Sequence, residues 1–237
     1  MITFEIITIF PNIFDSYLKE SLISRAQKKN LIKIHLHNLR DFSDDARGTV
    51  DDRPFGGGLG MVLKVEPIFK AVTALNKLQI TNYKLQKKSK TKIILFTPRG
   101  KKFNQKMALQ LSKLDQIIFV CGRYEGVDQR VAEKIADMEL SIGDYDLMGG
   151  ELPAMVAIES ISRLVPGVLG KEALLKERIT KSGGFIEYAQ YTRPPKFLLK
   201  QKFGRARPEI WSVPKVLLSG DHKKIEEWKK EHGKVIE

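Results

Sequence analysis

The amino-acid sequence predicts an α/β fold in which helices cover both faces of a parallel sheet. Short apolar runs alternate with stretches of helical spacing along most of the chain, a pattern typical of such folds. Three successive apolar runs are also followed by glycine-bearing turns, at residues 97–100, 122–126 and 142–145. Because α/β folds bind ligands at the carboxyl ends of their parallel strands, these turns are the first candidates for a functional site.

The N-terminal segments are predicted to be a strand, a helix and a second strand. Residues 2–10 are rich in Ile, Phe and Thr and end at Pro11, which favours a buried strand. Residues 13–29 carry apolar side chains at helical spacing, and residues 31–39 alternate apolar with polar side chains, as a half-buried strand does. The next segments are predicted to be a polar, glycine-rich loop, a helix and a basic connector, at residues 40–60, 66–78 and 84–92.

The middle of the chain supplies the three apolar runs that precede the glycine-bearing turns. They cover residues 92–96, 116–120 and 140–142, and helical patterns lie between them at 104–114 and 128–136. Such strands, buried on both faces, read as continuous apolar runs rather than as alternating ones. The sequence therefore predicts that these three strands are neighbours in one sheet.

The C-terminal part divides into three segments. A helix is predicted over residues 151–164, and Pro166-Gly167 ends it. Residues 1–167 are thus predicted to form the main domain, and the loosely patterned, charged residues 168–184 an interdomain linker. Residues 185–237 are predicted to be a small, basic and mainly helical region, because one amphipathic helix follows Ser219-Gly220-Asp221.

Composition narrows the range of partners. The 237 residues carry a formal net charge of +13, which favours a polyanionic partner such as nucleic acid, although a generally lysine-rich composition is the alternative. A membrane-surface role is less favoured, since no long basic amphipathic helix stands out. The single cysteine allows no intramolecular disulfide, and the four histidines show no metal-ligand spacing, so no metal is expected. The N-terminus lacks a basic leader and a cleavage pattern, which predicts a cytoplasmic protein.

Each glycine-bearing turn is weak evidence alone, because strands often end in glycine for steric reasons. Together they predict one pocket, in which backbone N–H and C=O groups hold an adenine ring and an acidic side chain meets ribose hydroxyls. No phosphate-cradling motif is present, which fits a cofactor without phosphates. The loop of residues 49–61 has four glycines within five residues, and it is either a functional loop or a tight structural turn.

Seven ordered motifs resemble those of the bacterial tRNA (guanine-N(1))-methyltransferases of the SPOUT superfamily, which modify the guanosine just 3′ of the anticodon. They are TVDDRPFGGGLGM from Thr49, LFTPRG from Leu95, CGRYEGVDQR from Cys121, SIGDYDLMGGELPAM from Ser141, SRLVPGVLG from Ser162, QYTRP from Gln190 and VLLSGDH from Val216. The resemblance runs from Met1 to about Gly170 and then resumes near Tyr191.

This resemblance implies a trefoil knot near the C-terminal edge of the α/β domain, which periodicity could not reveal. It also implies tRNA as the substrate and a homodimer whose active sites are shared between chains. The implied cofactor is S-adenosylmethionine, held by Thr97, Pro98, Gly100, Gly122, Tyr124, Glu125, Ile142, Gly143, Asp144, Tyr145, Asp146, Leu147, Gly149, Gly150 and Pro153. The glycine-rich loop is assigned to substrate binding through Asp51, Arg53, Gly57 and Gly58.

Two catalytic residues follow from the same resemblance. N1 of guanine carries a proton at neutral pH, so methylation needs a general base, and a fixed cation stabilises the charge that builds on the neighbouring carbonyl oxygen. Arg163 stands at the position of the family's cation; from the sequence alone it reads as a surface residue. The family's general base is an Asp in the interdomain linker. Counting without a gap from Gly170 puts Arg178 at the position of this Asp, and a shift of one residue puts Glu177 there. We assign Glu177 as the base.

The chain departs from the family pattern at three places. The linker lacks the family's acidic segment in intact form, residues 200–208 are a cation-rich insertion, and the chain ends soon after Trp228. These departures leave two alternatives to the expected activity. One is a methyltransferase of this superfamily that acts on a different RNA, and the other is a non-catalytic RNA-binding relative.

Overall fold

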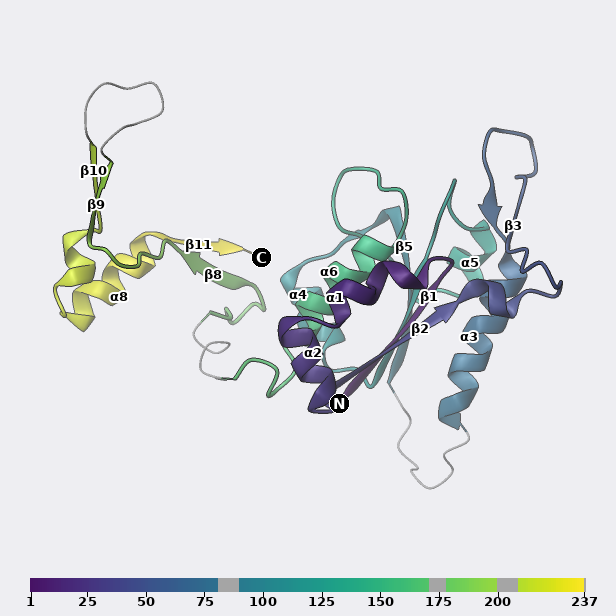
Figure 1. The fold of residues 1–237 in the computed structure, drawn as a ribbon, viewed down its shortest axis with the longest axis horizontal. Coiled ribbons are helices and arrows are strands. Elements are labelled where there is room, and N and C mark those ends of the chain that lie inside the picture. The colour runs from purple at the N-terminus through teal and green to yellow at the C-terminus, as the bar shows by residue number, and fades with distance from the viewer. Residues whose placement is uncertain (81–89, 171–177, 200–208, 237) are drawn as a thin grey trace. The chain divides into compact units, whose positions relative to one another are not determined.

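The computed structural model describes residues 1–80, 90–170, 178–199 and 209–236 (Figure 1). The chain divides into two compact units, residues 1–177 and residues 178–237. The division falls inside the segment 168–184 that the sequence assigns to a linker. Residues 178–184 are hydrogen-bonded within the second unit, where Ile186 N donates to Arg178 O at 2.8 Å and Thr180 N donates to Gly184 O at 2.9 Å.

The first unit contains the predicted parallel sheet. Its five strands lie in the order β2-β1-β6-β5-β7, and every neighbouring pair is parallel. β1 and β6 are almost entirely buried, and β5 is buried from Ile94 to Phe96, because most of their residues are apolar on both faces of the sheet. The strands are β1 (Ile2–Thr8), β2 (Ile32–Asn38), β5 (Thr91–Lys102), β6 (Gln116–Cys121) and β7 (Met138–Ser141).

Helices cover both faces of this sheet, as predicted (Figure 1). On one side lie α3 (Val65–Ile80) and α5 (Gln129–Lys134), packed on a buried apolar cluster that includes Ile7, Leu95 and Ile118. On the other side lie α1 (Asp15–Leu18), α2 (Ser21–Lys28), α4 (Gln105–Leu111) and α6 (Glu151–Ser162). Of two short 3₁₀ turns, η1 (Pro11–Phe14) contacts α6, whereas η2 (Leu39–Phe42) packs against α3.

Two segments differ from their predicted boundaries. The single helix predicted over residues 13–29 is divided between α1 and α2, and Ser21, where α2 begins, has a positive φ of 48°. The turn predicted at 97–100 lies inside β5, which continues to Lys102 after a register shift against β7 between Phe96 and Lys101. Apolar periodicity could not reveal either feature, because both depend on backbone geometry at single residues.

The second unit is wrongly predicted as mainly helical. Its described residues form two antiparallel pairs, β8 (Phe185–Tyr188) with β11 (Gly233–Ile236) and β9 (Lys196–Leu199) with β10 (Glu209–Ser212). They form one α-helix, α8 (His222–Glu231), capped by the Asp221 side chain, and the 3₁₀ turn η3 (Lys215–Leu218). Four-residue strands are too short to show an alternating pattern in the sequence.

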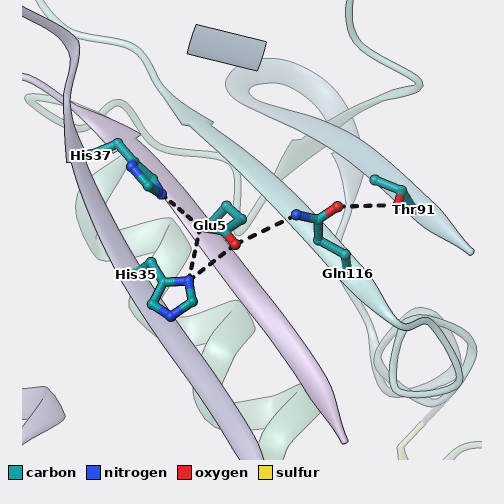
Figure 2. A network of polar contacts seen from close by, with 5 residues as sticks. All are labelled: Glu5, His35, His37, Thr91 and Gln116. Atoms are coloured by element: carbon teal, nitrogen blue, oxygen red, sulfur yellow. Dashed lines mark hydrogen bonds and ion pairs between the residues drawn. The ribbon is translucent and has the colours of Figure 1, made fainter. Parts of the chain in front are cut away.

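A buried carboxylate joins three strands of the sheet (Figure 2). Glu5 on β1 is 7% exposed, and its carboxylate oxygens lie 2.6 Å from His37 Nε2 and 3.1 Å from His35 Nδ1. Gln116 Nε2 donates to Glu5 Oε1 at 3.5 Å, and Thr91 Oγ1 donates to Gln116 Oε1 at 3.2 Å. The two histidines, which show no metal-ligand spacing in the sequence, therefore partner a buried acid.

This network makes stability depend on pH. Burial alone would raise the pKa of Glu5, but the hydrogen bonds from His37 and His35 outweigh it and hold the pKa below its ordinary value. A lowered carboxyl pKa contributes stability above pH about 4.5, and that stability is lost as pH falls through the lower, folded-state pKa. Urea unfolding of Glu5→Gln should show a deficit of about 1 kcal/mol at pH 7 that shrinks toward pH 3.5.

The exposed Glu133→Gln is the matched control, because a solvated carboxylate contributes little to stability at either pH. A deficit for Glu5→Gln that is constant across this pH range would contradict the assignment.

Candidate active site

A cavity of about 410 Å³ opens beside the middle of β5, where β6 and β7 end. It is lined by residues 95–99 of β5, by the loop 122–127 after β6 and by the loop 142–150 after β7. Thirteen of the fifteen residues assigned to the cofactor line it: Thr97, Pro98, Gly122, Tyr124, Glu125, Ile142, Gly143, Tyr145, Asp146, Leu147, Gly149, Gly150 and Pro153. Parallel strands end at the same edge of a sheet, so turns that are far apart in sequence meet there.

Further lining residues were not singled out from the sequence. Leu95 and Phe96 on β5 and Leu140 on β7 are buried strand residues that form an apolar wall. Arg99, Arg123 and Gln129 add polar groups, and Arg99 donates from its guanidinium to Gln129 Oε1 at 2.7 Å. Arg123 stands between two assigned residues, Gly122 and Tyr124, and that adjacency was the one signal that could have identified it.

Two assigned cofactor residues do not line the cavity. A Cβ on Gly100 would lie 2.5 Å from both the N and the C atom of Leu140, so this glycine allows β5 to pass close to β7. The Asp144 carboxylate is exposed and forms an ion pair with Lys102 on β5. Both residues stand inside the right motifs, but their place in the fold indicates structural roles.

Backbone hydrogen bonds hold the cavity loops together. Gly150 N donates to Gly122 O at 3.0 Å, and Arg123 and Gly149 form an isolated antiparallel bridge. A Cβ on Gly150 would lie 2.7 Å from Cys121 Cα, so only glycine permits this approach. The loop after β7 is closed locally, since Ser141 Oγ donates to Gly143 O at 2.8 Å.

A buried ion pair fixes the same loops to α6. Glu151, the first residue of α6, is 1% exposed and accepts from Arg123 Nε at 2.9 Å and from Thr8 Oγ1 at 2.7 Å. The Arg123 guanidinium also lies 4.8 Å from the centre of the Phe10 ring and donates to Met148 O at 3.3 Å. A carboxylate in the first turn is further stabilised by the helix dipole.

The glycine-rich loop assigned to substrate binding touches the loop after β6. It is carried by the two-stranded pair of β3 (Asp51–Asp52) and β4 (Val62–Leu63). Glu125 N donates to Met61 O at 3.0 Å, and a Cβ on Gly60, whose φ is +95°, would lie 2.7 Å from Glu125 Cγ. The loop therefore lies against a residue that lines the cavity.

The assigned substrate residues lie at different depths in this region. Asp51 is half-buried and hydrogen-bonded to Tyr124, and its charge adds to the effect of burial in raising the Tyr124 pKa. Arg53, Gly57 and Gly58 are exposed, and the two glycines have φ of 82° and 131°. Asp51 is therefore placed beside a cavity residue, whereas the other three lie on the exposed part of the loop.

Of the two assigned catalytic residues, the structure describes only Arg163, and it does not bring Arg163 to this cavity within one chain. Arg163 is exposed at the C-terminal end of α6, whereas Pro153, near the start of that helix, lines the cavity. A 12-residue helix is about 18 Å long, so the Arg163 backbone lies well away from the cavity. Glu177 falls outside the described residues.

Neither a metal-ligand cluster nor a membrane-spanning helix is present among the residues that the structure describes. Within those ranges, no group of three or more His, Cys, Asp or Glu side chains is arranged to hold a metal ion. Nor does any described helix combine the length and the apolar character needed to cross a membrane.

The fold and the cavity define a parallel α/β protein whose ligand site lies at the carboxyl ends of its strands. The family model described as "tRNA (Guanine-1)-methyltransferase TrmD" matches residues 2–235. A tRNA (guanine-N(1)-)-methyltransferase of Clostridioides difficile (strain 630) is 46% identical over 228 residues, which are 96% of this chain and 90% of the relative. One from Dictyoglomus turgidum is 46% identical over 230 residues, 97% of this chain and 84% of the relative.

A solved structure agrees with these relatives. The tRNA (m1G37) methyltransferase from Aquifex aeolicus superposes with a TM-score of 0.73 at 39% identity, covering 98% of this chain and 88% of that one. The chain belongs to the tRNA (guanine-1)-methyltransferase family.

Proposed function

We propose that this protein transfers a methyl group from S-adenosylmethionine to N1 of the guanosine 3′ of the anticodon in tRNA. One observation carries the proposal: three motifs shared with the family, distant in sequence, meet at one cavity. The net charge of +13 suits a polyanionic substrate.

The cavity suits this methyl donor. Its volume of about 410 Å³ is in the range of small-molecule sites, and its apolar wall of Leu95, Phe96 and Leu140 suits an adenine ring. Most of the remaining lining is loop backbone, which offers N–H and C=O groups to the ring edge. The Glu125 carboxylate lines the cavity, and we assign it to accept from ribose hydroxyls. We retain thirteen of the fifteen assigned residues in this role and leave out Gly100 and Asp144.

When bound, the donor supplies an electrophilic methyl group on a sulfonium sulfur. We assign Glu177 as the general base that takes the proton from guanine N1 as the new N–CH₃ bond forms. The electrons of the broken S–CH₃ bond remain on sulfur. Arg163 is assigned to stabilise the negative charge that develops on the guanine carbonyl oxygen.

A homodimer would bring Arg163 to a cavity. Since it stands at the far end of α6 from its own cavity, we propose that Arg163 serves the cavity of a second copy of the chain. The exposed apolar side chains Leu152 and Val156 on α6 and Met148 just before it offer a surface for that contact. We further propose a cytoplasmic location, and a trefoil knot in the segment that contains β5, β6, β7 and the cavity loops.

The activity is tested with labelled donor and unmodified tRNA transcripts that carry or lack the target guanosine. Label is expected only in the transcript that carries it. Label in neither transcript would mean that this chain is a non-catalytic relative. Label in both would mean a different target position.

The catalytic assignments are tested by Arg163→Ala and Glu177→Gln. Loss of a charge-stabilising or proton-accepting group should lower kcat by about 10²-fold or more with little change in KM for the donor. If Glu177→Gln retains full turnover at neutral pH, another group is the base. A pure rise in KM for Arg163→Ala would remove Arg163 from the catalytic set.

A further inference from the structure

The β9–β10 hairpin of the second unit exposes an aromatic pair. Phe197 on β9 and Trp211 on β10 are direct cross-strand partners, so they lie on the same face of the hairpin. Their ring centroids are 5.8 Å apart, and they remain 48% and 51% exposed. At these exposures, about half of each aromatic side chain is available to a ligand.

The opposite face of the hairpin is apolar but has no aromatic residue. There, Leu198 and Ile210 are cross-strand partners and are 52% and 58% exposed. Lys196 and Ser212 are paired beside them on the same face. The hairpin thus has two faces of similar exposure, of which one carries rings and the other aliphatic side chains.

Charge indicates what kind of partner the aromatic face meets. Residues 178–237 contain 14 Lys and Arg against 7 Asp and Glu, an excess of +7. About a quarter of the chain therefore carries more than half of the total charge of +13. Binding to an apolar protein surface requires no excess of positive charge, whereas binding to the phosphates of a nucleic acid does. On the aromatic face the charged neighbour on β10 is Glu209, two residues before Trp211, so the attraction for phosphates comes from the overall excess of the unit. Exposed aromatic rings on such a cationic unit are what unpaired bases stack on.

We propose that the Phe197–Trp211 face is a stacking platform for an unpaired base of the tRNA substrate. This inference rests on the proposed function, because it takes tRNA as the RNA that is bound. The platform adds affinity by stacking on a ring face, which every base possesses, and the cations of the unit hold the adjoining phosphates. The seven motifs that carry the resemblance to the family include neither aromatic residue.

The test measures the Kd of the full-length protein for a tRNA transcript and compares the two faces of the hairpin. Trp211→Ala should raise this Kd about tenfold, because stacking on one aromatic ring contributes an effect of that order. Trp211→Phe should retain most of the affinity, since a smaller ring still stacks. Ile210→Ala, on the aliphatic face, is the matched control and should leave the Kd unchanged.

Three results would overturn the proposal. The first is an unchanged Kd for Trp211→Ala. The second is an equal loss for Trp211→Ala and Ile210→Ala, which would mean that the hairpin acts only structurally. The third is a special case of the first: if Trp211→Ala leaves the Kd unchanged and also sediments as a smaller assembly than wild type, the face contacts a second copy of the chain. Circular dichroism of each variant confirms that the second unit remains folded.

This test and the test of the proposed function fail separately. Wild-type protein that binds tRNA through Trp211 but does not methylate it would refute the function and leave the platform standing. If wild-type protein methylates tRNA but Trp211→Ala binds tRNA as tightly as wild type does, the platform is refuted and the proposed function stands.

Discussion

Glu151→Ala is expected to destabilise the first unit by about 3–5 kcal/mol, because it leaves the Arg123 guanidinium without its carboxylate in a largely buried setting. The Arg123 side chain is 17% exposed and that of Glu151 2%, so water replaces the lost partner poorly. Thr8 Oγ1, which is also buried, loses its acceptor in the same substitution. Urea unfolding followed by far-ultraviolet circular dichroism measures the loss.

Two variants separate the ion pair from its surroundings. Thr8→Val removes two hydrogen bonds, the one that Thr8 Oγ1 donates to Glu151 and the one that it accepts from Phe10 N, and it leaves the ion pair in place, so it should cost about 1–2 kcal/mol. Glu159→Ala, on the same helix, removes an exposed carboxylate that accepts from Tyr17 and should cost less than about 1 kcal/mol. A Glu151→Ala protein as stable as the Glu159→Ala protein would show that the buried pair does not hold the loops.

Gly100→Ala is expected to destabilise the first unit by about 3 kcal/mol or more. The added Cβ would lie 2.5 Å from the N and C atoms of Leu140, and no side-chain rotation relieves a contact with backbone. The strands β5 and β7 would have to separate where their register shifts. Thermal and urea unfolding of the variant should both show the loss.

The matched control is Gly170→Ala. A Cβ on Gly170 would have no neighbour within 4 Å, and its φ lies outside the left-handed region. This variant should unfold within about 0.5 kcal/mol of wild type. Equal stability of Gly100→Ala and Gly170→Ala would contradict the close approach of β5 and β7.

The parallel sheet and the cavity were predictable because both follow from strand order. Strands that are buried on both faces give continuous apolar runs, and their ends meet at one edge, so most lining residues could be assigned from three motifs. Gly100 and Asp144 were assigned with them, since a motif does not distinguish a residue that lines a cavity from one that packs behind it. The buried pair of Arg123 and Glu151 was missed, because nothing in the spacing relates residues on different elements.

Other features depend on information that a sequence pattern lacks. The division of residues 13–29 into two helices depends on the φ of a single serine. Each strand of the second unit is four residues long, which is too few for an alternation of apolar and polar side chains to stand out from chance. The exposed position of Arg163 agrees with what its sequence context alone suggests, and its catalytic assignment remains a prediction that depends on a second copy of the chain.

The hydrogen bond between Thr8 and Glu151 has a consequence for the order in which the protein matures. It links residues 143 positions apart, and through Arg123 it ties the first strand to the wall of the cavity. During synthesis, the cavity cannot reach its final shape until α6 has left the ribosome and docked on β1. Nascent chains that end before residue 151 should therefore fail to retain the methyl donor, even though they already contain β5, β6 and β7.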